Sequence, residues 1–498
     1  RAHLGRSMTG SWQAADVLLR TANDGTRCIP DSQRRVGVLL PNVNGLVLTL
    51  FGLNAFGRVA AMLNFTAGTK SLKAAVRAAE IKTVITSRRF IDTAKLDDVV
   101  SALQAAEMGQ GPGVRFIYLE DVRRAITPGD KAMGLVRSWF AAAVHRRHGL
   151  GPDDPAVILF TSGTEGLPKG VVLSNRNLVA NAGQIAAHAL DAWGPDDVVM
   201  NPLPMFHSFG LTAAGLLPLF SGMKTILYPS PLHYKQVPAL IKATGATVLF
   251  ATDTFLQGYA RAADTDDLKS VRVVVCGAER VKEATRGLWN KWGTIILEGY
   301  GATECSPVIA CNLPNDNTPG TVGRLLPGIE ARLDRVEGIA DGGKLLVRGA
   351  NVMLGYMRAE TPGVIEPPEG GWHDTGDIVS IDPLGRVTIK GRAKRFAKIG
   401  GEMVSLAAVE TMVANLWPDA NHVVVAIPDP RKGEQLVLVT DKADAEKGAL
   451  LQHAKADGFA ELWVPRAILV VANIPVLGSG KVDLPATLEL ARATRPLL

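Results

Sequence analysis

Cysteine is scarce in this chain. Its 498 residues include only Cys28, Cys276, Cys305 and Cys311. Their spacing matches neither a zinc site nor a disulfide framework. We therefore expect a protein of a reducing compartment that folds without structural disulfides.

Long apolar runs are also missing. The most apolar early stretch, residues 46–56, contains Asn54 and is followed by Arg58, so it is too short for a transmembrane helix. No signal peptide is recognisable at the start. The first residue is Arg1 instead of Met, which suggests a fragment of a longer chain.

A strong charge of either sign is absent as well. The 54 basic and 48 acidic residues leave a net charge of +6, and 47% of the residues are hydrophobic. This composition is that of a soluble globular protein, and the length suggests roughly two to four domains. A modest positive excess fits nucleotides, a phospholipid surface or an acidic carrier protein as partners. We expect no nucleic acid partner.

The chain alternates strand-like and helix-like segments. A helix-like stretch that ends at Phe56 lies between two short apolar segments, which predicts parallel sheet with covering helices. We therefore expect an α/β protein with a large N-terminal domain of mixed or parallel sheets and a small α/β C-terminal domain. The predicted strands are Val36–Leu40, Val59–Leu63, Ile81–Thr86, Val114–Leu119, Val271–Val275, Val423–Ile427 and Leu436–Thr440.

Residues 131–147 predict an amphipathic helix, because Leu135, Val136, Trp139 and other apolar residues recur at helical spacing among basic ones. Two interpretations stay open. The helix packs on its own domain, or it docks on a membrane surface or an acidic partner. His148 and Asp153 nearby have the spacing of glycerolipid acyltransferases, which we interpret as coincidence because a two-residue pattern is weak.

The most informative stretch is residues 159–170, LFTSGTEGLPKG. The runs Ala156–Phe160 and Val171–Leu173 on either side predict two strands. The turn between them offers backbone N–H groups, hydroxyl groups and the charge of Lys169 to a polyphosphate. It is not a Walker A loop, because Gly170 follows the lysine where Ser or Thr is required. An ordinary glycine-rich hairpin is the alternative interpretation.

The full string resembles the phosphate-binding signature of the adenylate-forming superfamily: acyl-CoA synthetases, luciferases and adenylation domains of peptide synthetases. These enzymes convert a carboxylate and ATP into an acyl-adenylate and pyrophosphate, and most then pass the acyl group to a thiol. The resemblance implies ATP and Mg²⁺ as cofactors. It also implies that phosphate is bound by Thr161, Ser162, Gly163, Thr164, Gly166 and Lys169.

Residues 295–307 match the second nucleotide motif of the superfamily. The resemblance implies that Tyr300 and Gly301 lie at the adenine, with the Tyr300 ring available for stacking. It places the hydroxyl of Thr303 at the α-phosphate and makes Glu304 a ligand of Mg²⁺. Both Thr303 and Glu304 are therefore candidate catalytic residues.

Two further motifs concern the acyl pocket. The resemblance puts Gly277, Ala278 and Glu279 against the adenine and the acyl group. Residues 201–210 match an aromatic motif that lines the acyl and thiol tunnels, and His207 there is a candidate gate or packing residue beside the carboxylate. The Phe-Asp pair of amino-acid-activating relatives is missing, which favours a plain carboxylic acid.

The C-terminal motifs imply a domain that moves. Residues 389–395 match a hinge with its pivot at Lys394, between an N-terminal domain at 1–392 and a mobile C-terminal domain at 393–498. Relatives commonly carry an acidic residue in place of Arg395, so we assign it no role. The resemblance implies that Asp377 contacts ribose and that Arg392 contacts ribose or phosphate. It also implies that Lys481 contacts the carboxylate and the α-phosphate. Lys398, Gly400 and Gly401 would serve the thioester step.

Three stretches, residues 61–68, 206–212 and 480–485, are similar to one branch, the acyl-[acyl-carrier-protein] synthetase domain of bifunctional 2-acylglycerophosphoethanolamine acyltransferases. This resemblance implies a long-chain fatty acid as substrate and acyl carrier protein as acceptor. It also implies phospholipid recycling at the cytoplasmic side of a bacterial inner membrane, with peripheral membrane contact. An acyltransferase domain would lie upstream.

Three alternatives stay open. They are a free-standing fatty acyl-CoA synthetase with CoA as acceptor, an acyl-adenylate ligase without thioester activity, and a non-catalytic nucleotide or acyl-adenylate binding protein. The presence of Glu304, Asp377 and Lys481 together argues against the last.

Overall fold

The computed structural model divides the chain into two compact units. Unit 1 comprises residues 1–330 and 348–373, and unit 2 comprises residues 331–347 and 374–498. The predicted boundary at residue 392 concerns which part moves, and it stays a prediction. The described residues are 29, 33–105, 113–140, 143, 151–161, 168–339, 341–399, 402–475 and 482–493.

The first sheet of unit 1 is seven-stranded, with the order β16-β6-β5-β2-β1-β3-β4. Its five consecutive strands from β5 to β4 pair in parallel, whereas β6 pairs antiparallel with both β5 and β16. The strands are β1 (Arg35–Val38), β2 (Val59–Met62), β3 (Thr83–Thr86), β4 (Arg115–Tyr118), β5 (Pro155–Thr161), β6 (Lys169–Ser174) and β16 (Gly355–Met357).

Helices bury both faces of this sheet. Along β2, Ala60 and Met62 enter the core shared with α2, whereas Val59 and Ala61 enter the core shared with α3 and α5. Successive strand residues point to opposite faces, so an unbroken apolar strand needs cover on both sides. The helices of this part are α2 (Asn44–Ala55), α3 (Gly68–Ala78), α4 (Arg88–Ala94), α5 (Asp97–Gln104) and α6 (Leu119–Ala125). The predicted α/β class is confirmed.

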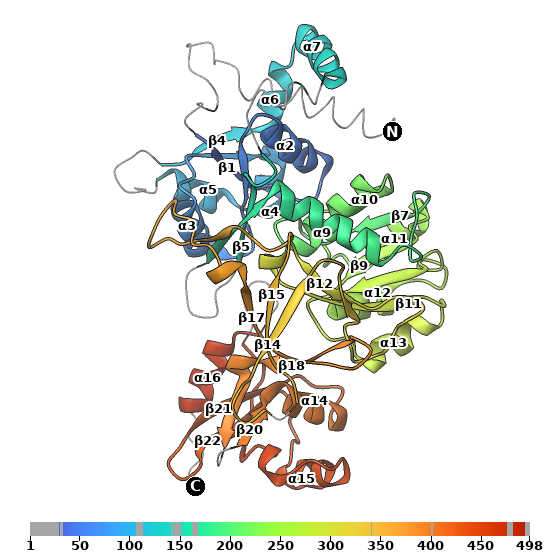
Figure 1. The fold of residues 1–498 in the computed structure, drawn as a ribbon, viewed down its shortest axis with the longest axis vertical. Coiled ribbons are helices and arrows are strands. Elements are labelled where there is room, and N and C mark those ends of the chain that lie inside the picture. The colour runs from blue at the N-terminus through green and yellow to red at the C-terminus, as the bar shows by residue number, and fades with distance from the viewer. Residues whose placement is uncertain are drawn as a thin grey trace. The chain divides into compact units, whose positions relative to one another are not determined.

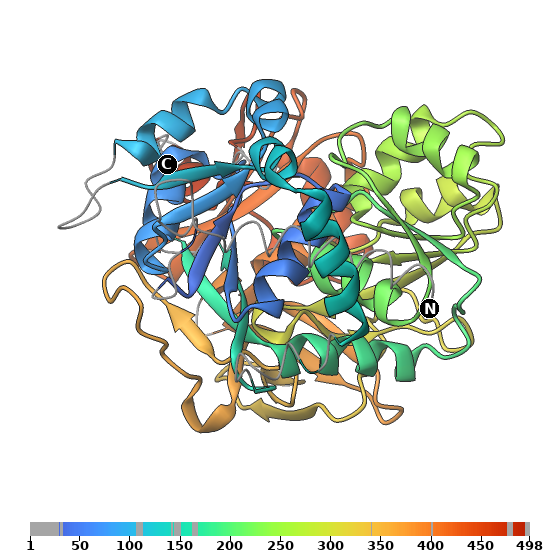
Figure 2. The ribbon, with the colours of Figure 1, turned by 90° about the horizontal axis from the view of Figure 1, so that it is seen from above.

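The second sheet repeats this plan with the order β13-β12-β11-β10-β9-β7-β8. A parallel block again ends in an antiparallel hairpin, here β11 and β12. Figures 1 and 2 show the blue elements of the first sheet beside the green elements of the second. The strands are β7 (Val198–Asn201), β8 (Lys224–Leu227), β9 (Val248–Ala251), β10 (Val273–Cys276), β11 (Ile295–Gly301), β12 (Val308–Cys311) and β13 (Arg324–Leu325).

Helix α9 (Asn175–His188) and the π-helix η1 (Phe209–Leu216) serve both sheets. Leu178 and Leu211 belong to a core of the first sheet, whereas Ile185 and Ala213 belong to a core of the second. The other face of the second sheet is covered mainly by α11, α12 and α13. The remaining helices of this part are α10 (Leu217–Phe220), α11 (Gln236–Thr244), α12 (Asp253–Ala262), α13 (Glu283–Asn290) and the 3₁₀ helix η2 (Thr303–Cys305).

Unit 2 contains a four-stranded and a five-stranded sheet. The two predicted strands near residues 423 and 436 form an antiparallel pair in which Val423 lies opposite Val439, as expected. The elements are β14 (Glu330–Asp334), β15 (Gly343–Arg348), β17 (His373–Ile381), β18 (Val387–Arg392), η4 (Ala393–Arg395), β19 (Phe396–Ile399), β20 (Glu402–Ser405), α14 (Leu406–Leu416), β21 (His422–Asp429), β22 (Gly433–Thr440), α15 (Lys447–Ala456), η5 (Glu461–Trp463), β23 (Ala467–Val470) and α16 (Leu484–Ala493), with η3 (Glu369–Gly371) in unit 1.

The helix predicted over residues 131–147 begins earlier, as α7 (Pro128–Trp139). The first turn is closed by Asp130, whose Oδ2 accepts hydrogen bonds from the Thr127 amide at 2.8 Å and the Thr127 hydroxyl at 2.7 Å. Proline fits this first turn because its missing N–H has no partner there. After Phe140 only Ala143 is described, so the predicted end at residue 147 lies outside the described residues.

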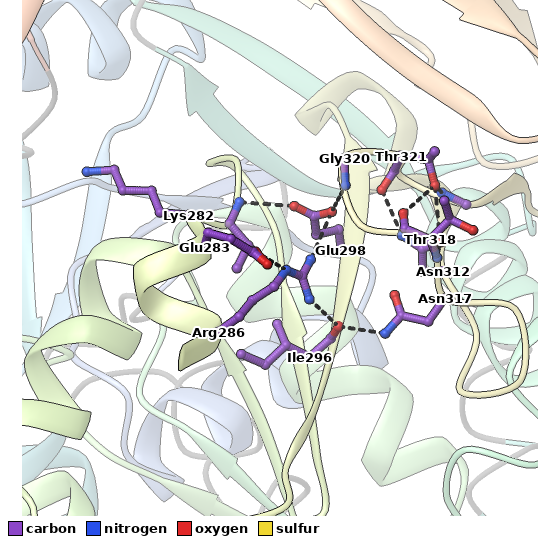
Figure 3. Close-up of polar contacts among 12 residues, drawn as sticks. Lys282, Glu283, Arg286, Ile296, Glu298, Asn312, Asn317, Thr318, Gly320 and Thr321 are labelled. Carbon is purple, nitrogen blue, oxygen red and sulfur yellow. Dashed lines mark hydrogen bonds and ion pairs between the residues drawn. The ribbon is translucent and has the colours of Figure 1, made fainter. Parts of the chain in front are cut away.

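A buried ion pair ties α13 to β11 (Figure 3). Glu298 is 4% exposed, and its carboxylate lies 3.1 Å from the Arg286 guanidinium. The same carboxylate accepts hydrogen bonds from the amides of Val281 and Gly320, each at 3.1 Å. One side chain therefore joins a helix, a strand and the loop around residue 320.

We expect Glu298→Ala to lower the free energy of unfolding of unit 1 by about 3–5 kcal/mol, because the buried Arg286 loses its nearer carboxylate and the amides of Val281 and Gly320 lose their acceptor. The matched control is Glu330→Ala, which removes an ion pair with Arg348 whose side chains are half exposed, and which should cost less than about 1 kcal/mol. Urea unfolding followed by amide hydrogen exchange in α13 and β11 measures both. Equal small losses would contradict the assignment.

Candidate active site

The predicted phosphate loop connects two paired strands. Thr161 ends β5 and Lys169 begins β6, and the two residues lie opposite each other in the antiparallel ladder. The two predicted strands are therefore confirmed, and a strand instead of the helix of a Walker A motif begins at Lys169. Ser162, Gly163, Thr164 and Gly166 lie outside the described residues.

The second predicted nucleotide motif occupies the corresponding place in the other sheet. It follows β11 and includes Tyr300, Gly301, and the η2 residues Thr303 and Glu304. A Cβ atom on Gly301 would lie 2.2 Å from the carbonyl oxygen of Pro307, so only glycine fits this turn. Tyr300 is 7% exposed, and little of its ring is accessible in this conformation.

Strand β16 joins the two motifs. Its residue Tyr356 pairs with Val171 of β6, directly after the phosphate loop. Just before β16, the Leu354 amide donates to the Val172 carbonyl at 2.9 Å, and the Met353 amide donates to the Glu304 carbonyl at 2.8 Å. This segment therefore holds Glu304 next to the strand that begins with Lys169.

Side chains make the same connection. The Tyr356 hydroxyl donates a hydrogen bond to Glu304 Oε1 at 2.7 Å. Lys169 Nζ lies 5.3 Å from the centre of the Tyr356 ring, and the Arg358 guanidinium carbon lies 5.4 Å from it. The aromatic ring thus has two cation-π partners, Lys169 at the start of β6 and Arg358 just after β16, and presents its hydroxyl to the carboxylate.

Tyr356 is a hydrogen-bond donor at every physiological pH. Burial, followed by the charge of Glu304 and the hydrogen bond to it, raises the pKa of Tyr356 far above its usual value. A neutral phenol can donate to a carboxylate, whereas a phenolate cannot. The contact therefore orients Glu304 without adding charge to the site.

Glu304 fits a magnesium site of the kind found in nucleotide enzymes. Among the residues that the structure describes, no group of three or more His, Cys, Asp or Glu side chains could hold a metal ion. Mg²⁺ bound with a nucleotide commonly takes one or two protein carboxylates together with phosphate and water. A single oriented carboxylate beside a phosphate-loop strand fits that donor set, whereas it would not fit a closed zinc site.

Two buried asparagines of α9 support the junction, and the sequence analysis missed them. Asn177 donates to the carbonyls of Ala350 and Val352 at 2.9 and 2.8 Å, and it also forms the capping box of α9 with Ser174. Asn181 is fully buried and exchanges hydrogen bonds with both backbone groups of Val308. The signal for Asn177 was its position three residues after Ser174, but nothing in the sequence indicated its distant partners.

The motif at residues 201–210 meets the second nucleotide motif. The hydroxyls of Ser208 and Thr303 lie 3.4 Å apart. His207 is exposed, and its ring centre lies 4.7 Å from that of the buried Phe206. A Cβ atom on Gly210 would lie 2.4 Å from the Pro204 carbonyl oxygen, which fixes this tight turn.

The Gly277-Ala278-Glu279 segment also reaches this motif. A Cβ atom on Gly277 would lie 3.3 Å from the Phe209 ring. Ala278 has a φ of 67°, a left-handed conformation that is uncommon for alanine. Glu279 is engaged already, because its Oε2 accepts hydrogen bonds from the amide and the hydroxyl of Thr254 at 2.9 and 2.8 Å.

The remaining predicted residues lie in unit 2. Asp377 and Arg392 are cross-strand partners in β17 and β18, with Arg392 Nε 2.8 Å from Asp377 Oδ1. The sequence analysis assigned both to the nucleotide but did not foresee this ion pair. Lys394 is exposed in η4, and Lys398 Nζ lies 3.5 Å from Glu337. Gly400, Gly401 and Lys481 lie outside the described residues.

Arg395, to which no role was assigned, forms an ion pair with Glu410 of α14. Glu410 also accepts a hydrogen bond from the Val424 amide at 2.8 Å. The arginine therefore belongs to the packing of unit 2.

None of the three described cysteines is a candidate nucleophile. Cys276, Cys305 and Cys311 are buried and free of disulfides. Burial raises the pKa of Cys276 and Cys305 well above the usual value and that of Cys311 to about 12. Their thiols are neutral at physiological pH and therefore unreactive.

Known proteins share the sequence and the fold. The chain is 27% identical to the mitochondrial medium-chain acyl-CoA ligase ACSF2 of Danio rerio over 90% of this chain and 78% of that one. It is 26% identical to a long-chain-fatty-acid–CoA ligase of Escherichia coli O157:H7, over 82% of this chain and 77% of the other. The crystal structure of ATP-bound MatB from Rhodopseudomonas palustris matches with a TM-score of 0.78 and 25% identity, over 98% of this chain and 93% of that one.

The family itself is defined by the part of the chain that contains both nucleotide motifs. The family model described as AMP-binding enzyme matches residues 31–357, which is more than half of the 498 residues and ends at the last residue of β16. The cofactors of this family are ATP and Mg²⁺, as the motifs predicted. The chain therefore belongs to the AMP-binding enzyme family.

Proposed function

We propose that this chain is an AMP-forming ligase that activates a fatty acid with ATP and then transfers the acyl group to a pantetheine thiol. The observation that carries the proposal is the contact between Lys169, Tyr356 and Glu304, which joins the two nucleotide motifs of an AMP-binding family member. A binding protein without activity would not need a carboxylate oriented in this way beside the phosphate loop.

The first step is a matter of charge rather than of proton transfer. A carboxylic acid is already ionised at neutral pH, so an anion must approach a polyanion. A carboxylate oxygen attacks the α-phosphorus of ATP, the bond to the bridging oxygen breaks, and pyrophosphate leaves with the electron pair. Lys169 and the hydroxyl of Thr303 are the described donors for the phosphates, and Glu304 would hold Mg²⁺. Magnesium, when bound, neutralises negative charge on the phosphates.

The residues of unit 2 complete the proposal. Asp377 would accept hydrogen bonds from ribose, and Arg392 would contact ribose or phosphate. Lys481 would contact the carboxylate and the α-phosphate, whereas Lys398, Gly400 and Gly401 would serve the thioester step. Movement about Lys394 would exchange these two sets after adenylation.

Fatty acids are the substrate class that the relatives favour. The two relatives above are named for medium-chain and long-chain fatty acids. The segment Phe206–Gly210 is aromatic and apolar around His207, and it lacks an acidic residue that could hold an α-ammonium group. A plain carboxylate with an apolar tail therefore suits the site better than an amino acid.

The acceptor has two candidates. The names of the relatives favour CoA. The resemblance of residues 61–68, 206–212 and 480–485 to acyl-carrier-protein synthetase domains favours acyl carrier protein, and with it phospholipid recycling at the cytoplasmic side of a bacterial inner membrane. Both acceptors present the same pantetheine thiol, so the chemistry is shared and only the recognition of the carrier differs.

Release of AMP in the presence of palmitate, ATP and Mg²⁺ tests the proposal, with CoA or holo-acyl carrier protein supplied in parallel. We expect palmitate-dependent AMP release with one of the two thiols. Turnover with carrier protein alone would assign the phospholipid-recycling branch, and turnover with CoA alone would assign the acyl-CoA ligases. A folded protein that releases no AMP with either thiol would contradict the proposal.

Tyr356→Phe should weaken the binding of Mg²⁺–ATP by about tenfold or more, because Glu304 loses the hydrogen bond that orients it. Calorimetric titration with Mg²⁺–ATP measures this independently of turnover. The control is Tyr228→Phe, which also removes one tyrosine hydrogen bond, to His233 on the surface, and should leave the affinity unchanged. If both variants bind like the unmodified chain, Tyr356 does not position the metal ligand.

Lys394→Pro should slow thioester formation at least about tenfold more than adenylation, because proline restricts the backbone of the predicted pivot. Lys394→Ala is the control, since it removes the side chain but leaves the backbone free. Pyrophosphate exchange reports the first step, and conversion of supplied acyl-adenylate to thioester reports the second. Equal losses in both steps would argue against a pivot at this residue.

A further inference from the structure

The buried side of helix α7 is not its apolar side. Asp130 is 1% exposed and Gly134 is buried, and these two residues lie four positions apart on one side of the helix. Figure 1 shows α7 at the outer edge of unit 1, reached through α6. An ordinary surface helix places its apolar residues on this inner side instead.

The apolar side of α7 is exposed. Val136, Trp139 and Phe140 are 45%, 73% and 60% exposed, and Met133 and Leu135 are 48% and 46% exposed. At about 100° per residue, Leu135, Val136 and Trp139 fall on the side opposite Asp130 and Gly134. Single exposed apolar residues are common, but five within eight positions form a patch that indicates a binding surface.

The charges next to this patch are mainly positive. Lys131 on α7 and Arg123 and Arg124 at the end of α6 are exposed. Arg124 also lies 3.5 Å from the carboxylate of Asp121 on the same helix. The surface therefore combines large apolar groups, including a tryptophan, with cations, which is the composition of helices that lie in the interface of an anionic bilayer.

We infer that α7 is a membrane-docking helix that inserts Trp139, Phe140 and their apolar neighbours into the interface of a bilayer containing anionic lipids. Helix α7 has 12 residues, too few to span a bilayer, so the contact that it makes is peripheral. Among the described residues no helix is long and apolar enough to cross a membrane. A second copy of this chain fits less well, because a symmetric contact through α7 would bring the cations of the two copies together.

Only the benefit of membrane docking rests on the proposed function, because a ligase for fatty acids gains by being held where such acids are released or dissolved. Its evidence is the exposed apolar side of α7 and the cations on α6 and α7. The attachment concerns unit 1, whose α7 contains none of the residues assigned to the reaction. Loss of docking should therefore leave the reaction with a water-soluble acid intact.

Co-sedimentation of the whole chain with vesicles tests the inference. The vesicles contain phosphatidylcholine with about a third phosphatidylglycerol, or phosphatidylcholine alone. We expect the chain to bind the anionic vesicles, and to bind more weakly as the salt concentration rises. The double variant Trp139→Glu, Phe140→Glu should lower binding roughly tenfold or more.

The matched control is Leu190→Glu, because Leu190 is 75% exposed, close to the value for Trp139, but lies outside α7. It should bind vesicles like the unmodified chain. Turnover of octanoate without vesicles should be the same in all variants. If neither palmitate nor octanoate is turned over but α7-dependent binding is found, the proposed function fails and the docking helix stands.

Three results would overturn the inference. The first is no binding to anionic vesicles, or equal binding to both kinds of vesicle. The second is binding that the double variant does not reduce. The third is a concentration-dependent dimer that the double variant abolishes, since a second copy would then be what covers α7.

Discussion

The hydrogen bond from Tyr356 to Glu304 is the contact on which the arrangement of the site depends. It links residues that belong to different sheets, because Glu304 follows β11 of the second sheet whereas Tyr356 lies on β16, which is added to the edge of the first. The backbone bond from Met353 to Glu304 repeats the link a few residues earlier. Together with α9 and η1, which pack on both sheets, these bonds fix the position of one nucleotide motif relative to the other.

The two sheets have similar plans, which explains why the short strand β16 is enough to connect their nucleotide motifs. In each sheet a parallel block ends in an antiparallel hairpin, and each hairpin carries one nucleotide motif. Helix α9 begins immediately after β6 and supplies Asn177 and Asn181 to the neighbouring segments. Buried amides without partners cost free energy, so these residues hold the segments in one position and make the junction specific.

Helix α7 takes no part in the junction between the two nucleotide motifs. A helix that buries Asp130 and Gly134 and exposes Trp139 gains little from the hydrophobic effect in the part of the chain that the structure describes. Its stability on unit 1 therefore comes from other contacts, including the Thr127–Asp130 hydrogen bonds at its start. A bilayer interface would cover this exposed apolar side. The proposed docking role is therefore argued from the orientation of α7 and not from the reaction.

The sequence by itself determined the α/β class and some of the strands in each unit, because these depend on local periodicity. The two nucleotide motifs were identified by their resemblance to a known family. It also identified residues such as Glu304 by type. Only the tertiary structure decided their partners: Tyr356 for Glu304, Arg392 for Asp377 and Val308 for Asn181. Such contacts join residues 15 to 127 positions apart, and pairing over these distances is set by strand order and helix packing, which no local pattern contains. The outward direction of the apolar side of α7 was likewise not readable, because periodicity shows that a face exists but not what it meets.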